Sequence, residues 1–279
     1  MRRLWGSSVA VLFGVVAVLA LACGDDAGLD PTPAAQTSPQ LSGKVTVFAA
    51  ASLTDAFNEI AKEFKKRNPQ TEIEFNFAGS PALRTQLEQG ARADIYASAD
   101  MPNMTQALTA GLVQDAGRVF VKNSLVIIMP KDNPGKINAP ADLRKGGLKL
   151  VFAAPEVPVG NYARQVLGLM EKDAASGAGF SEAVLKNVVS NESNVKQVVA
   201  KVELGEADGG IVYGTDVTSS VAPKLATVQI PTQLNVIAEY PIALTKKPRN
   251  AAVAQAFVAF VTGSDGQAIL KKYGFQTLS

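Results

Sequence analysis

The chain has no histidine and only one cysteine, Cys23, in 279 residues. Without histidine, acid–base catalysis by imidazole, Ser-His or Cys-His activation of a nucleophile, and His-ligated metal sites are excluded. A single cysteine can form neither a disulfide within the chain nor the cysteine clusters that hold zinc or iron–sulfur centres. These two absences remove the commonest routes to nucleophilic and metal-centred catalysis.

A strong net charge is also missing. The 27 basic residues outnumber the 25 acidic residues by two, and Arg2 and Arg3 account for the excess. The rest of the chain therefore has no net field that favours nucleic acid or an anionic membrane. Hydrophobic residues at 47% and charged residues at 19% exclude a disordered chain, and the length favours two lobes over one compact core.

Residues 1–22 have the pattern of an export signal. Arg2 and Arg3 form a basic start, and residues 4–21 carry no charge. This apolar run is also about long enough for an uncleaved membrane anchor, which is the alternative. The chain then reads Leu19-Ala-Leu-Ala-Cys23, which resembles a bacterial lipobox. The resemblance implies cleavage before Cys23 and lipidation of its thiol, which predicts an exported lipoprotein at the outer face of the cell membrane or in the periplasm.

Residues 23–43 are expected to form the lipidated cysteine and a flexible tether. The segment 24–43 is rich in Pro, Ala, Thr, Ser and Gln and has no apolar period. Fully stretched, it would reach about 70 Å at ~3.5 Å per residue. Such a tether would connect a globular domain to the membrane through the lipid alone.

From Lys44 onward, short β-branched or aromatic runs alternate with helical patterns, which predicts an α/β fold with mostly parallel sheets flanked by helices. Amphipathic helices are expected over 54–67 and 251–261. Turn residues before two of the strands suggest two crossings between lobes, so lobe 1 is expected to be 44–122 plus 240–279 and lobe 2 to be 123–239. The expected strands are 45–49, 73–77, 95–98, 125–129, 148–153, 210–213, 227–230 and 240–244.

Two strands in lobe 1 lead through small residues into a serine and then a helix. Ser52 is predicted as an N-cap, with Asp55 completing a capping box, and Ser80 is predicted as the N-cap before Pro81. Two helix N-termini at the carboxyl edge of one sheet would favour an anion. The alternative is that both serines only cap their helices.

Lobe 2 offers further helix starts. A Pro/Gly-rich turn at 155–160 precedes a helix expected to begin near Asn161, and Asn194 is predicted as an N-cap that makes Val195 the first helical residue. Tyr213 ends a strand, where its hydroxyl can point into a cleft. For both Val195 and Tyr213 the alternative is ordinary core packing.

No basic side chain lies inside these segments. Lys196, next to Val195, is the one basic residue beside them, so a phosphate site built from arginine pairs is not favoured. A fully deprotonated anion held by neutral N–H and O–H donors fits better. Asp94 and Asp100 flank a strand-like run, and we expect them to cap turns rather than to bind a metal.

Six short motifs resemble, in order, those of the molybdate-binding proteins of ABC transporters, and the resemblance covers essentially all of 44–279. It implies a two-lobed class II periplasmic-binding fold with an oxyanion between the lobes. The motifs are Phe48-Ala-Ala-Ala-Ser52-Leu-Thr, Ala93-Asp-Ile-Tyr-Ala-Ser-Ala-Asp100, Asn123-Ser-Leu-Val, Gly209-Gly-Ile-Val-Tyr213-Gly-Thr-Asp216, Glu239-Tyr-Pro241 and Tyr273-Gly-Phe275.

The resemblance implies that five residues bind molybdate or tungstate: Ser52, Ser80, Val159, Val195 and Tyr213. The match at Val159 depends on Gly160, because the family's loop commonly reads Pro-Glu-His-Val-Pro-Ala-Gly and this chain is one residue shorter and lacks the histidine.

The resemblance also implies a monomer that delivers its ligand to a membrane permease, with no enzymatic activity and no cofactor. The alternatives are the same machinery for another oxyanion such as sulfate, a hydrolase, or an adhesion lipoprotein. The chain has no G-x-S-x-G motif and no P-loop to support a hydrolase.

Overall fold

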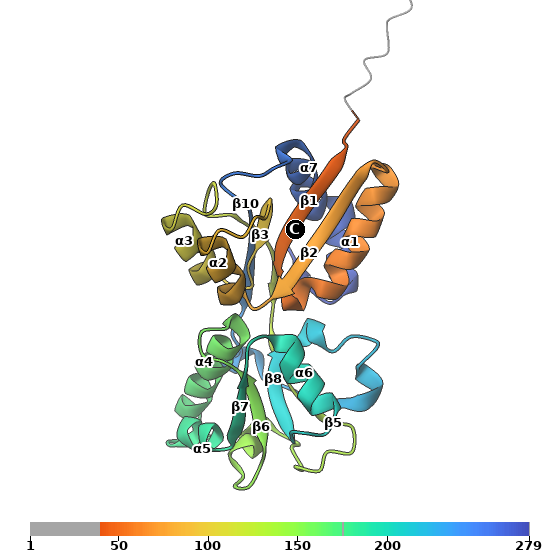
Figure 1. The fold of residues 1–279 in the computed structure, drawn as a ribbon. Coiled ribbons are helices and arrows are strands. Elements are labelled where there is room, and N and C mark those ends of the chain that lie inside the picture. The colour runs from red at the N-terminus through yellow and green to blue at the C-terminus, as the bar shows by residue number, and fades with distance from the viewer. Residues whose placement is uncertain (1–39, 175, 279) are drawn as a thin grey trace, which may run out of the picture. The chain divides into compact units, whose positions relative to one another are not determined.

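A computed structural model describes residues 40–174 and 176–278. The expected signal peptide, Cys23 and most of the tether lie outside the described residues. Strands and helices alternate along the chain, as expected for an α/β fold (Figure 1). The strands are β1 (Gly43–Ala50), β2 (Thr71–Ala78), β3 (Ile95–Ala97), β4 (Arg118–Asn123), β5 (Leu125–Pro130), β6 (Leu150–Ala153), β7 (Val188–Glu192), β8 (Gly209–Tyr213), β9 (Leu225–Gln229), β10 (Ala238–Leu244) and β11 (Gln276–Thr277). The α-helices are α1 (Thr54–Arg67), α2 (Ser80–Glu88), α3 (Met101–Thr109), α4 (Pro158–Lys172), α5 (Phe180–Lys186), α6 (Val195–Glu203), α7 (Ala251–Thr262) and α8 (Ser264–Lys272).

The strands form two separate sheets. The first has the order β11-β4-β10-β3-β1-β2, and the second has the order β7-β6-β8-β5-β9. In the first sheet β1 is parallel to β2 and β3, whereas β10 is antiparallel to β3 and β4. In the second sheet β6 is parallel to β7 and β8, but β5 is antiparallel to β8 and β9. Most strands of each sheet therefore run in one direction, as expected, but both sheets are mixed, because β10 and β11 run against the rest of the first sheet and β5 against the rest of the second.

Each sheet is covered by helices on both faces and forms one lobe, as expected for a two-lobed fold (Figure 1). Lobe 1 consists of the first sheet with α1, α2, α3, α7 and α8, and lobe 2 of the second sheet with α4, α5 and α6. The chain passes from lobe 1 to lobe 2 between β4 and β5, where only Ser124 separates the strands, and returns between β9 and β10.

The packing of α1 follows from its apolar spacing. Phe57, Ile60 and Phe64 are all buried on the face that meets the first sheet. The Phe57 ring lies 6.0 Å from that of Phe75 in β2, and the Phe64 ring meets that of Phe257 in α7 edge-on at 5.3 Å. These aromatic contacts fix α1 against the sheet, and the observed bounds of α1 match the predicted helix 54–67.

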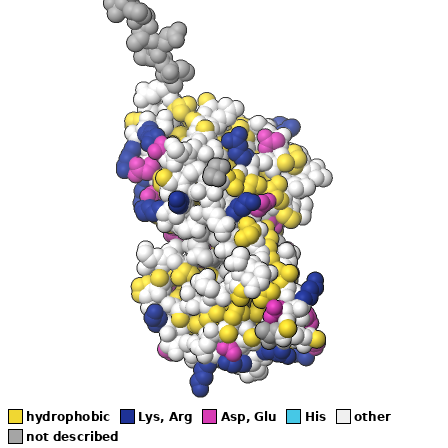
Figure 2. Space-filling view, turned by 180° about the vertical axis from the view of Figure 1, so that it is seen from behind, with side chains coloured by type: hydrophobic (Ala, Val, Ile, Leu, Met, Phe, Trp, Pro, Cys, Tyr) yellow, Lys and Arg dark blue, Asp and Glu magenta, His cyan; other side chains and the backbone are white. Residues whose placement is uncertain are grey.

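The surface carries charges of both signs. On the face seen in Figure 2, basic and acidic side chains are interspersed over both lobes. Ion pairs join several of them, such as Lys122 with Glu239 at 2.8 Å and Lys224 with Glu203 at 2.7 Å. Within the described part of the chain, no helix is both long enough and apolar enough to cross a membrane.

Candidate functional site

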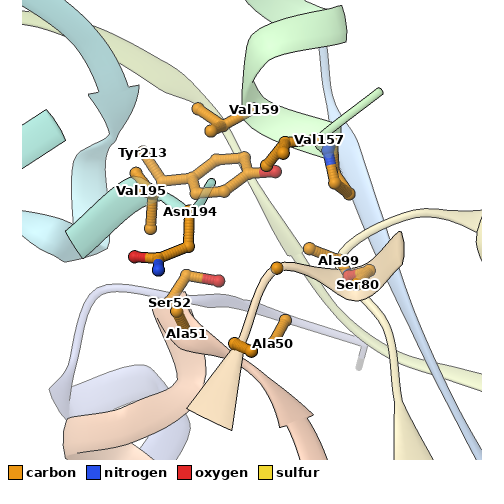
Figure 3. A pocket seen from close by; sticks show the side chains of 13 residues that line it. Ala50, Ala51, Ser52, Ser80, Ala99, Val157, Val159, Asn194, Val195 and Tyr213 are labelled. Carbon is orange, nitrogen blue, oxygen red and sulfur yellow. The ribbon is translucent and has the colours of Figure 1, made fainter. Parts of the chain in front are cut away.

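A small pocket lies where the two lobes meet, and it encloses about 20 Å³. A pocket this small suits a compact ligand of a few heavy atoms rather than an extended molecule. All five residues predicted to bind an oxyanion line it, with lobe 1 residues on one side and lobe 2 residues on the other (Figure 3). The lining residues are Ala50, Ala51, Ser52, Ala78, Gly79, Ser80, Ala99, Val157, Pro158, Val159, Asn194, Val195 and Tyr213.

Ser52 does not cap α1, so the predicted capping box with Asp55 was wrong. Between β1 and α1 the chain makes a 3-10 turn over Ala51–Leu53, which places Ser52 inside this turn. The residue at the N-cap of α1 is Leu53, and no side chain caps that helix. The Ser52 hydroxyl instead lies 3.0 Å from the hydroxyl of Tyr240.

Ser80 is the first residue of α2 rather than its N-cap, so that prediction was wrong by one position. Gly79 is the N-cap. The Ser80 hydroxyl oxygen accepts a hydrogen bond of 3.0 Å from the amide of Ala99. Since this bond uses a lone pair of the oxygen, the hydroxyl proton of Ser80 remains available to a ligand in the pocket.

The first turn of α4 presents Val159 to the pocket. The helix begins at Pro158, three residues before the predicted start, because the amide of Asn161 already donates to the carbonyl of Val157 at 2.9 Å. Proline suits this first position, where a helix has no acceptor for an N–H. The amide of Val159 follows in the same turn and has no acceptor within the helix.

Asn194 caps α6, and this prediction is confirmed. Its side chain accepts a hydrogen bond of 3.2 Å from the amide of Gln197. The side chain of Gln197 in turn accepts from the amide of Ser193 at 3.1 Å, which fixes the chain just before the helix. Val195 is therefore the first helical residue, as predicted, and its amide has no acceptor within the helix.

Tyr213, at the end of β8, is 1% exposed. Its hydroxyl makes no hydrogen bond to any residue that the structure describes. Burial raises the pKa of Tyr213 well above its ordinary value, with the neighbouring Tyr240 adding to the effect. The hydroxyl therefore keeps its proton, and a buried, protonated and unpaired hydroxyl requires an acceptor.

Among the residues that the structure describes, none with a charged side chain lines the pocket. The amides of Val159 and Val195 lie at the starts of two helices, where the partial positive charge of a helix favours an anion. The hydroxyls of Ser52, Ser80 and Tyr213 complete a set of neutral groups that can donate hydrogen bonds. The nearest lysine by sequence, Lys196, is already paired with carboxylates.

Asp94 and Asp100 have the structural roles expected of them. The Asp94 carboxylate accepts hydrogen bonds from the amides of Thr46 at 2.7 Å and Asn250 at 3.4 Å. Asp100 caps α3 by accepting from the amide of Asn103 at 3.1 Å. Among the described residues, no group of three or more acidic or cysteine side chains is arranged to hold a metal ion.

Three residues around the pocket, Asn123, Asp216 and Tyr240, were not among the predicted site residues. Tyr240 and Asn123 form a hydrogen-bonded group behind Ser52. Asp55 and Asp216 both lie close to Lys196. Asn123, Asp216 and Tyr240 fall inside the quoted motifs, so the signal was present, but nothing in the local pattern predicted their contacts.

A two-lobed α/β fold with a small pocket of donors between its lobes defines a solute-binding protein. In agreement with this fold and site, residues 45–276 match the model of a protein family described as bacterial extracellular solute-binding protein. The chain belongs to this family, whose members bind a solute rather than transform it. Accordingly it is not an enzyme, and its ligand is a solute and not a cofactor.

Individual relatives are similar over most of their length. The molybdate-binding protein ModA of Mycobacterium tuberculosis (strain ATCC 25618 / H37Rv) is 38% identical over 270 residues, 97% of each chain. The molybdate-binding protein ModA of Escherichia coli (strain K12) is 35% identical over 240 residues, 84% of this chain and 89% of that protein. Among solved structures, the substrate binding domain of a putative molybdenum ABC transporter from Clostridium difficile has a TM-score of 0.61 at 28% identity and covers 85% of this chain and 99% of that one.

Proposed function

We propose that this protein is the substrate-binding component of an ABC importer that captures molybdate, and also tungstate, between its two lobes and delivers it to a membrane permease. The observation that carries the proposal is the pocket itself, in which the five predicted donor residues meet and, within 40–174 and 176–278, no charged side chain takes part. The molybdate-binding relatives support the choice of ligand.

The hydroxyls of Ser52, Ser80 and Tyr213 and the amides of Val159 and Val195 are the proposed ligand donors. All five groups donate hydrogen bonds, which suits an anion with no proton of its own. Hydrogen bonds to a charged acceptor contribute about 1.5–3 kcal/mol each, roughly twice the value for neutral pairs. The helix starts at Val159 and Val195 add their dipoles.

Size and protonation would distinguish the tetrahedral oxyanions. Molybdate and tungstate have nearly equal metal–oxygen bonds, whereas sulfate is smaller, so a donor ring set for the larger ions misses some sulfate oxygens. Each buried donor left unpaired costs about 1–3 kcal/mol. Phosphate keeps a proton near neutral pH, and a ring of donors offers that proton no acceptor.

Titration calorimetry of the purified protein with molybdate, tungstate, sulfate and phosphate at pH 7 tests the proposal. We expect molybdate and tungstate to bind at least 100-fold more tightly than sulfate, which corresponds to about two missed donors. Phosphate should give no measurable heat. Displacement of molybdate by sulfate at comparable concentration would instead favour a sulfate-binding protein with the same machinery.

We further propose that the protein is exported as a monomeric lipoprotein. Residues 1–22 would be removed, and the lipid on Cys23 and the tether 23–43 would hold the body near the permease. The two lobes, 44–122 plus 240–279 and 123–239, would close around the ligand by bending at the two crossings. Labelled fatty acid should be incorporated into the wild type but not into Cys23→Ala, whereas a wild-type protein that stays in the membrane fraction without label would indicate an uncleaved anchor.

A further inference from the structure

One ammonium group connects the two lobes directly beside the pocket. The Nζ atom of Lys196, the second residue of α6, lies 2.8 Å from a carboxylate oxygen of Asp55 in the first turn of α1. It also lies 3.5 Å from a carboxylate oxygen of Asp216, which follows β8. Lys196 and Asp216 belong to lobe 2, whereas Asp55 belongs to lobe 1.

The two carboxylates differ in how they depend on the arrangement of the lobes. The Asp216 side chain is fully buried and belongs to the same lobe as Lys196, whereas 44% of the Asp55 side chain is exposed. If the lobes separate, Lys196 retains Asp216 but loses Asp55, whose carboxylate then returns to water. A buried carboxylate needs a partner, so Asp216 keeps the lysine in place for Asp55.

The titration behaviour of these groups agrees with the geometry. Burial alone would lower the pKa of Lys196, but Asp216 and Asp55 outweigh it and raise the pKa. Burial raises the pKa of Asp216 to about 6, against the opposing effect of Lys196. Lys196 is therefore charged at neutral pH and faces these two carboxylates.

We propose that Lys196 is a latch that pairs with Asp55 only when the lobes close on the bound oxyanion, and so slows release of the ligand. This inference rests on the function proposed above. Val195, whose amide is a proposed ligand donor, directly precedes Lys196 at the start of α6. The same movement of this helix start therefore brings the Val195 amide to the ligand and Lys196 to Asp55. Because the pair forms after the ligand has entered, its loss should act mainly on the dissociation rate.

The sign of one substitution separates the latch from a simple effect of charge. Asp55 is negative and lies near a site for an anion, so if it acted only through its field, Asp55→Asn would strengthen binding. If Asp55 instead holds the lobes closed through its ion pair with Lys196, the same substitution weakens binding. Asp55 is exposed enough that its replacement should leave lobe 1 folded.

The test measures the Kd of molybdate by calorimetry and its release rate with labelled molybdate chased by unlabelled molybdate. The variants are Asp55→Asn, Lys196→Met and the double variant. Lys201→Met is the matched control for the lysine, because Lys201 is on the same helix and pairs with Glu192 within lobe 2 at 2.7 Å. Glu59→Gln is the control for the acid, because Glu59 is on α1 and pairs with Lys272 within lobe 1 at 2.7 Å.

We expect Asp55→Asn and Lys196→Met each to weaken binding by about 5- to 20-fold, as for a partly buried ion pair, chiefly through faster release. The double variant should have a Kd for molybdate no higher than the higher of the two single-variant values. Both controls should have a Kd within about twofold of the wild-type value. Unchanged or tighter binding by Asp55→Asn overturns the latch. A wild-type protein that binds no molybdate would instead overturn the proposed function.

Discussion

The hydroxyl oxygens of Ser52 and Tyr240 lie 3.0 Å apart, so one of these two groups donates a hydrogen bond to the other. The Tyr240 oxygen lies 3.5 Å from the side-chain nitrogen of Asn123, an atom that can only donate. Asn123 therefore donates to Tyr240, so the proton of Tyr240 is free to be donated to the oxygen of Ser52. When Tyr240 donates in this way, the proton of Ser52 is left for a ligand, and Tyr240 acts as a positioning residue for the pocket.

Replacement Tyr240→Phe should lower the affinity for molybdate by about 3- to 10-fold. It removes one buried hydrogen bond, nominally ~1 kcal/mol, and allows the Ser52 hydroxyl to turn away from the ligand. Calorimetry measures the change. Tyr273→Phe is the control, because the Tyr273 hydroxyl bonds to Glu59 at 2.8 Å and takes no part in lining the pocket. Equal affinity of Tyr240→Phe and the wild type would show that Ser52 needs no such orientation.

Ser52→Ala and Ser80→Ala should each weaken molybdate binding by roughly 10- to 150-fold, since each removes a hydrogen bond to a charged acceptor. Their effects on stability should differ. Ser80→Ala leaves the buried amide of Ala99 without its acceptor, at a cost of about 1–3 kcal/mol. Ser52→Ala leaves Tyr240 with Asn123 and should cost less.

Calorimetry and thermal unfolding of both serine variants provide the measurements, with the exposed Ser219→Ala as control. Binding as tight as that of the wild type in both variants would place the site elsewhere. A larger loss of stability in Ser52→Ala than in Ser80→Ala would contradict the assigned hydrogen bonds.

Structural features that depend on interactions between residues close in the sequence were predicted correctly. The apolar spacing of Phe57, Ile60 and Phe64 was sufficient to predict α1 with its observed bounds. Asn194 was identified as a cap because its partner, the amide of Gln197, is only three residues away. Propensity and spacing act over one or two turns of a helix, and within that range they determined the structure.

Contacts between residues far apart in the chain could not be predicted from the sequence. Ser52 was expected to cap α1, but its hydroxyl partner is Tyr240, 188 residues away. The pairing of β10 antiparallel to β3 and β4 depends on where the chain re-enters lobe 1, which alternating hydrophobicity does not encode. The contact between Lys196 and Asp55 likewise needs both lobes in place.

Asp216→Asn should alter how stability depends on pH. Burial raises the pKa of Asp216 to about 6 in the folded protein, against about 4 for an unfolded chain. The protonated form is thus favoured by folding, so this contribution to stability is fully present below about pH 4 and is lost as the pH rises through 6. Relative to Asp216→Asn, the wild type should lose up to about 3 kcal/mol of unfolding free energy between pH 4 and 7.5.

Urea unfolding of the wild type and Asp216→Asn at several pH values measures this difference. The exposed surface substitution Asp132→Asn serves as the control and should give a difference from the wild type that varies little with pH. A constant difference between the wild type and Asp216→Asn across pH 4 to 7.5 would contradict the raised pKa of Asp216.

Gly79→Ala should block closure of the lobes without straining its own backbone. Gly79 has φ −62° and ψ 140°, which any residue adopts, but an added Cβ would lie 2.4 Å from the carbonyl oxygen of Ser193 in lobe 2. The closed arrangement cannot accept this contact, so molybdate affinity should fall by more than about tenfold as the lobes stay apart. Solution scattering should show that molybdate reduces the radius of gyration of the wild type and of the control Gly168→Ala, whose added Cβ meets nothing within 4 Å. Normal affinity and normal compaction in Gly79→Ala would mean that the lobes bind their ligand without approaching this closely.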